Sequence, residues 1–439
     1  MAQDSVPVAG GYSGSIIDSP SSYADTAAAD AGEGGIPPSL DLLSFSSGPE
    51  LTIVPARFRP LLDYFQHAVS RSLSCHEGIR RDICSAIIPI SLQSPHLLAA
   101  VLCVSACHRQ SAGLPQGYDE ITQLRTTAIQ SLNIALACSD RGESEAALGT
   151  SLVLCMCEIV SPEAKRDTWR LHLSGASALL SKLYAQRTSI LRQPSSAIAF
   201  MKRIYLSLKA IALGCGMASY RFIGDEVPLD DGSLPGNDYI DDLAGFSTAL
   251  LPIFNVINRL DKSESNQRAS CSVDADMPVH LLIQRVRTML AVRSHSTFRP
   301  TLVLPESTQT DFYLLDEAYH HMALLQLYRH AAPASPLYGG PDPATQVSVR
   351  RIISCISDME IESLPCPGVA TLPPLFTAGR AATAPQDRER ILRLLDKVWG
   401  CFGMGNVVAT REFLQRLWSG DALCREEDGD TETWDFLPY

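Results

Sequence analysis

Apolar side chains recur at helical spacing along most of the chain after residue 55, most densely between residues 144 and 183. Leu148, Leu152 and Ile159 fall on one helical face, and the residues between them are largely apolar too. A helix that is apolar on nearly every side belongs in a core with several neighbours around it. Beyond Ser161-Pro162, a second apolar period comprises Trp169, His172, Leu173, Ala176, Leu179, Leu180 and Leu183. The pattern predicts two buried helices, with Asp167 capping the second.

The same periodicity predicts helices over most of the remaining chain. They cover about 58–73, 94–108, 119–135, 197–217, 239–260, 278–292, 311–330, 387–399 and 406–418. Pro/Gly-marked or polar stretches at 225–238, 262–276, 332–343 and 365–374 are predicted as loops. We find no convincing strand pattern and no Gly-x-Gly nucleotide loop. The sequence therefore predicts an all-α protein, a large bundle or stacked antiparallel helix pairs around a single extended core.

The two ends of the chain differ in composition from this helical part. Residues 1–50 are rich in Ser, Ala and Gly and contain seven acidic but no basic side chains, so we expect disorder there. Residues 55–420 are predicted to form one domain, and 421–439 an acidic-aromatic tail. In this tail Trp434, Phe436 and Leu437 are candidate anchors of an activation segment, because they alternate with acidic residues. The alternative is a segment that packs on the last helix.

Composition and charge limit the classes of function. Apolar residues make up 46% of the 439 residues and charged residues 19%, as in a globular protein with a large core. A net charge of -12 argues against broad electrostatic binding to nucleic acid. The thirteen cysteines show no disulfide framework, which suits a reducing compartment. No secretory signal opens the chain, and no apolar run reaches the ~20 residues of a membrane span.

Clusters of metal-ligating or nucleophilic residues are few. Cys103, Cys107 and His108 follow one another at i, i+4 and i+5, and His320, His321 and His330 share a predicted helix. Cysteines inside apolar helices usually serve packing, so we predict no metal site and no cofactor. Adjacent helical residues such as Cys107 and His108 point to different faces and cannot form a nucleophile–base pair. Glu158 and His172 are more simply hydrogen-bonded or exposed. No catalytic residue is predicted, and the chain is not expected to be an enzyme.

Five segments together resemble one known family. SLVLCMCEIV followed by TWRLHLSGASALL is similar to the most recognisable part of the fungal-specific transcription factor domain, the regulatory half of the fungal binuclear zinc-cluster regulators. The segments at 97–109, 242–251, 317–329 and 405–418 resemble further parts of that domain in the family's order. The resemblance implies a nuclear transcription regulator that contacts the transcription machinery, with control of a metabolic or specialised-metabolite gene cluster as the base expectation. Some relatives sense a hydrophobic small molecule, which implies a candidate effector here as well.

One departure from the family pattern concerns DNA binding. Family members normally carry six cysteines that hold two zinc ions ahead of the helical domain, built on C-x2-C pairs. Here no two cysteines lie three apart, and none precedes Cys75. We therefore expect no direct DNA binding by this chain, which would act through a DNA-bound zinc-cluster regulator or a homodimer partner, or represent a shortened product. The alternative function is a helical scaffold or hydrophobic small-molecule-binding protein without a transcriptional role.

Overall fold

The computed structural model of the chain describes residues 54–138, 141–161, 168–185, 195–216, 238–266, 278–292, 297–298, 302–331, 343–420 and 436–439. Throughout these residues the regular structure is helical, and only two isolated bridges, Tyr239 with Thr297 and Ile240 with Ser247, pair extended backbone. The all-α prediction is thereby confirmed. The predicted disordered segment 1–50, the predicted cap Asp167 and Trp434 of the tail lie outside the described residues.

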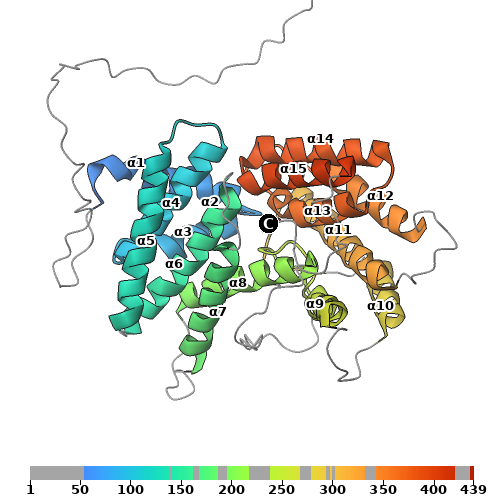
Figure 1. Cartoon of the computed structure of the whole chain (residues 1–439), viewed down its shortest axis with the longest axis horizontal. Helices are drawn as coiled ribbons and strands as arrows, with labels where there is room; N and C mark the ends of the chain where they lie inside the picture. Colours follow the sequence, from blue (N-terminus) through green and yellow to red (C-terminus); the bar gives the residue numbers. More distant parts are fainter. Residues whose placement is uncertain are drawn as a thin grey trace, which may run out of the picture. The chain divides into compact units, whose positions relative to one another are not determined.

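The first part of the chain forms a group of helices around α4 and α6 (Figure 1). Helix α4 packs against α5 and α6, and α6 packs against α7. A π-helical turn, Phe65–Val69, joins α1 to α2, so the single helix predicted over 58–73 is irregular in its middle. The elements are η1 (Ala56–Phe58), α1 (Arg59–Tyr64), α2 (Ser70–Ser72), α3 (Glu77–Ser91), α4 (Pro95–Ser111), α5 (Tyr118–Cys138), α6 (Arg141–Val160), α7 (Thr168–Ala185) and α8 (Ser196–Gly214).

The second part is organised around α11, which packs against α9, α10, α12 and α13 (Figure 1). This helix is buried on most of its faces, with Phe312, Leu315 and Tyr319 among its fully buried side chains. The elements are η3 (Thr248–Leu250), α9 (Leu251–Asn266), α10 (Val279–Val292), α11 (Glu306–Ala331), α12 (Pro343–Ser357), η5 (Pro367–Thr371), α13 (Leu372–Ala381), α14 (Pro385–Phe402) and α15 (Gly405–Ser419).

The α6–α7 pair is a core hairpin, as the apolar pattern predicts. Trp169 at the start of α7 is only 1% exposed, and the apolar side chains of α6 from Leu148 to Val160 are buried. Helices α6 and α4 approach closely at Gly149, where an added Cβ would meet Leu97 Cδ2 of α4 at 3.2 Å. At Gly175 of α7, an added Cβ would make only ordinary contact. A side chain at position 149 would therefore have to displace Leu97 by a few tenths of an ångström, whereas one at position 175 would not.

Some expectations about element boundaries are wrong: α9 runs on to Asn266, into the predicted 262–276 loop, and two further differences have clear local causes. Residues 239–247 form a turn rather than the start of a helix, because the Asp241 carboxylate accepts from the backbone N–H groups of Leu243 and Ala244. Such side-chain bonds offer the backbone an alternative to the helix. Helix α13 occupies part of the predicted 365–374 loop, because its prolines Pro373 and Pro374 lie in the first turn, where no backbone N–H is needed.

Candidate functional site

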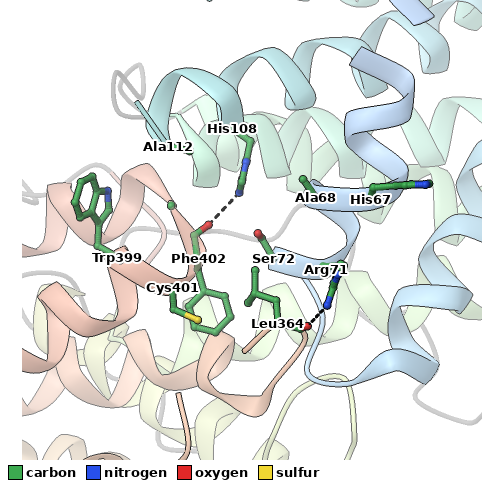
Figure 2. Close-up of a pocket in the computed structure, with 12 residues that line it drawn as sticks. His67, Ala68, Arg71, Ser72, His108, Ala112, Leu364, Trp399, Cys401 and Phe402 are labelled. Carbon is green, nitrogen blue, oxygen red and sulfur yellow. Dashed lines mark hydrogen bonds between the residues drawn. The ribbon is translucent and has the colours of Figure 1, made fainter. Parts of the chain in front are cut away.

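A surface cleft lies between the α1–α2 segment, the end of α4 and the end of α14 (Figure 2). Its volume is about 480 Å³, within the range of small-molecule sites in proteins. The cleft is lined by His67, Ala68, Arg71, Ser72, His108, Ala112, Leu364, Trp399, Gly400, Cys401, Phe402 and Gly403. The segments that meet here are far apart in sequence, so the cleft exists only in the folded domain.

His108 of α4 lines this cleft and is held in place by two hydrogen bonds. Its Nε2 lies 3.0 Å from the Phe402 carbonyl oxygen, which only accepts, so Nε2 carries a proton. Its Nδ1 lies 3.0 Å from the Tyr64 hydroxyl and accepts from it. Burial lowers the pKa of His108, so the imidazole is neutral near pH 7. The neutral His108 imidazole is hydrogen-bonded at both ring nitrogens and so links α4 to α1 and α14. It is a structural group rather than a general base.

The rim of the cleft is polar and contains one exposed aromatic side chain. His67 and Arg71 are exposed, and the Arg71 guanidinium donates to the Leu364 carbonyl oxygen (Figure 2). The Trp399 indole is 44% exposed, which is unusual for so large an apolar group. Basic groups on the rim together with an exposed indole and apolar walls such as Leu364 and Phe402 suit an amphipathic molecule.

A buried charged centre joins α3, α8 and the 239–247 turn. Arg203 Nη2 lies 2.7 Å from Asp242 Oδ1, and His76 Nε2 lies 3.0 Å from Asp242 Oδ2. Burial alone would raise the pKa of Asp242, but the His76 hydrogen bond and the Arg203 charge lower it to about 2. Asp242 is therefore ionised over the whole physiological pH range and holds three elements together.

The same turn is fastened to α11. The backbone N–H of Ser247 donates to Asp316 Oδ1 at 2.7 Å. Gly245 adopts φ +82°, and an added Cβ would lie 2.5 Å from Leu315 Cδ2. Both the left-handed backbone and the close contact require glycine. The segment at 242–251, one of those that resemble the family, is thus a junction between the two helical parts.

The cysteine and histidine candidates separate in the fold. Cys103 and Cys107 lie together on α4, but their third neighbour is Cys157 of α6 rather than His108. His320 faces Asp316 on its own helix, whereas His321 faces Ser348 of α12. Sequence reasoning missed Cys157, because nothing in a single sequence pairs residues that lie so far apart along the chain.

The acid–base candidates are not arranged for catalysis. Glu158 Oε1 lies 3.5 Å from Arg125 Nη2, which makes it an ion-pair partner. Burial and the Arg125 charge lower the pKa of His172 to about 4, so this histidine is neutral at physiological pH. Neither group lines the described cleft.

The end of the tail packs into the core. Phe436 and Leu437 are 7% and 2% exposed, and the Phe436 ring lies 5.8 Å from that of Phe376 and 6.3 Å from that of Phe413. Asn406 Nδ2 donates to the carbonyl oxygens of Leu437 and Tyr439 at 3.2 and 2.9 Å. These contacts favour the packing interpretation over a solvated activation anchor for Phe436 and Leu437.

The described residues form an all-helical domain whose two groups of helices meet at the 239–247 turn. Residues 60–435 match the family described as "Fungal specific transcription factor domain", and the chain belongs to this family. The chain is also similar to the acriflavine sensitivity control protein acr-2 of Neurospora crassa, with 21% identity over 417 residues, which cover 88% of this chain and 66% of that protein. The chain thus spans just under two thirds of that relative's length. No solved structure matches the chain.

In the described part of the chain, every helix is too short or too polar to span a bilayer.

Proposed function

We propose that this chain is the regulatory domain of a nuclear transcription regulator that controls a metabolic or specialised-metabolite gene cluster. The observation that carries the proposal is the family match over 60–435, which includes the core hairpin and the 239–247 junction. That the chain is a transcription regulator follows from the family. Its nuclear localisation and the kind of genes that it controls are what we propose.

We propose further that the DNA-reading module is supplied from outside these 439 residues. The chain contains no C-x2-C pair and carries a net charge of -12, so it lacks the thiolate pairs and the basic surface that zinc-cluster DNA binding needs. A zinc-cluster regulator bound to the promoter, or a longer product of the same gene, provides that module. The chain then contributes contacts to the transcription machinery.

DNA binding and promoter occupancy test this arrangement separately. The purified chain is expected to show no sequence-specific binding to promoter DNA in physiological salt. In cells, the tagged chain is expected to occupy promoters only while its zinc-cluster partner or the longer product is present. Tight specific binding by the unaided 439 residues would contradict the proposal.

The alternative is a small-molecule-binding or scaffold protein without a transcriptional role, and the 480 Å³ cleft is the observation that favours it. The two functions are compatible in part, because an effector in this cleft would contact both α4 and α14 and could bias how the two helical parts pack. The polar rim favours an amphipathic effector over a purely hydrophobic one.

A further inference from the structure

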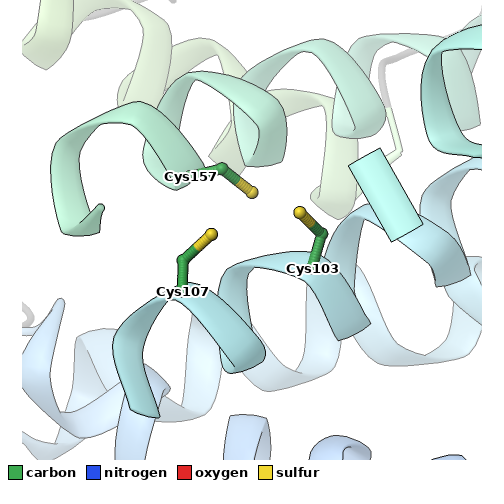
Figure 3. A group of neighbouring side chains, drawn as sticks. All are labelled: Cys103, Cys107 and Cys157. Carbon is green, nitrogen blue, oxygen red and sulfur yellow. The ribbon is translucent and has the colours of Figure 1, made fainter. Parts of the chain in front are cut away.

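Three cysteines meet in the core where α4 crosses α6. Cys103 and Cys107 lie one turn apart on α4, and Cys157 reaches them from α6, with the three sulfur atoms all within 4.8 Å of one another (Figure 3). Each residue is 0% exposed and each thiol is free. The three side chains point toward a common centre, an arrangement that a simple packing role does not require.

One ion pair borders this cluster. Arg125 Nη2 of α5 lies 3.8 Å from Cys107 Sγ, and it also pairs with Glu158 Oε1 at 3.5 Å. The charge of Arg125 is therefore already matched by a carboxylate. The Arg125 side chain keeps 14% of its surface exposed, whereas the three thiols are fully buried.

The number of donors restricts the ion that this cluster could hold. Among the residues that the structure describes, no fourth histidine, cysteine or carboxylate joins the three sulfurs. A structural zinc site needs four ligands, so this cluster does not fit one. With ion–sulfur bonds of about 2.3 Å, three sulfurs bound to one ion in a pyramid lie about 3.5 Å apart, so side-chain rotations that move each sulfur by about 1 Å close the site.

The net charge of the complex decides which thiophilic ion three buried thiolates can hold. Three thiolates around a monovalent or divalent ion leave a net negative charge in the core, and a buried unpaired charge is costly. A trivalent ion gives a neutral complex and leaves the Arg125–Glu158 pair undisturbed. We propose that Cys103, Cys107 and Cys157 form a binding site for trivalent arsenic, taken up as neutral arsenous acid.

The binding reaction is balanced without an oxidant or reductant. Three As–O bonds of As(OH)₃ break and three As–S bonds form, while each thiol proton leaves with a hydroxide as water. Arsenic stays in the +3 state, and three water molecules are released. Neutral reactants give a neutral product, as a buried site requires.

Arsenite added to the reduced full-length chain tests the proposal. We expect one bound arsenic per chain by native mass spectrometry and three As–S neighbours by X-ray absorption. We also expect a higher melting temperature, because three thiols held together by the fold bind the ion more tightly than the separated thiols of the unfolded chain. Cys157→Ala is expected to lose the third sulfur neighbour and to weaken binding at least tenfold. Cys155→Ala removes an equally buried thiol of α6 outside the cluster and is expected to bind arsenite as the unmodified chain does.

Cys366 and Cys401 form a second neighbouring pair of thiols, but this pair can supply only two sulfurs. Cys401→Ala should therefore leave the three-sulfur signal intact. Two As–S neighbours in the unmodified chain, or binding that Cys157→Ala does not change, would overturn the proposal. Preferential binding of Cu(I) or Zn(II) over arsenite at the same three thiols would overturn the charge argument that selects a trivalent ion.

Discussion

Arg203 of α8 and Asp242 of the turn before α9 are joined by a 2.7 Å ion pair, and His76 bonds the other oxygen of the same carboxylate. Asp242→Asn removes the closer of the two carboxylates that pair with Arg203, while Asp241 remains 3.3 Å away. Because Arg203 keeps one carboxylate partner, we expect the free energy of unfolding from urea melts at pH 7 to fall by about 2–3 kcal/mol, less than the cost of a fully broken buried pair. Asp396→Asn, which breaks the exposed pair with Arg411, should cost less than about 1 kcal/mol. Equal losses in both variants would contradict the assignment.

The same carboxylate predicts a pH dependence. The pKa of Asp242 is about 2 in the folded chain and 3.8 ordinarily, so its contribution to stability is present above the ordinary pKa. That contribution is lost as the pH falls from about 4 toward 2. The difference in unfolding free energy between the unmodified chain and Asp242→Asn should stay constant from pH 7 to 5 and narrow below about pH 4. A difference that is unchanged at pH 3 would contradict a depressed pKa.

Trp169 provides the test of the core hairpin. The side chain is 1% exposed between α6 and α7, so Trp169→Ala removes a large buried group and should cost about 3–5 kcal/mol in denaturant melts. Trp399→Ala is the matched control, because this indole is 44% exposed at the cleft, and its cost should stay below about 1 kcal/mol. A small loss of unfolding free energy in Trp169→Ala would contradict the central place of the α6–α7 hairpin in the core.

The tail gives a prediction that separates packing from activation. The Phe436 ring packs against both the Phe376 and the Phe413 rings, so Phe436→Ala should destabilise the domain by about 3–5 kcal/mol. If the tail serves only packing, Trp434→Ala should leave the transcriptional output per amount of folded protein unchanged. A loss of output in Trp434→Ala at an unchanged melting temperature would support the activation-segment hypothesis for that residue.

Much of the fold could be predicted from apolar periodicity, and the failures have local causes. The α6–α7 hairpin is readable because Leu148, Leu152 and Ile159 recur at helical spacing and need no distant partner. Residues 239–247 were misjudged because the turn depends on the Asp241 side chain and on the positive φ of Gly245, which periodicity does not register. Helix α3 was missed, and it contains a proline, Pro89, that breaks the usual helical signal.

The candidate sites were far less predictable than the fold. The cleft depends on His108 meeting the Phe402 carbonyl oxygen 294 residues further along, and no local pattern encodes such a contact. The three-thiol cluster likewise needs the crossing of α4 and α6 to bring Cys157 to Cys103 and Cys107. The spacing of the two α4 cysteines was visible, but the third ligand was not.

The central claim, that this chain regulates transcription, is tested most directly by fusing the full-length chain to an unrelated DNA-binding domain. Reporter expression is then measured from a promoter that carries the matching sites. We expect activation well above the DNA-binding domain alone, retained in the Asp396→Asn control outside the cleft and reduced in Trp169→Ala in step with the loss of folded protein. A reporter that stays silent while the fusion is folded, nuclear and as abundant as the control would contradict the account and favour the scaffold or small-molecule-binding alternative.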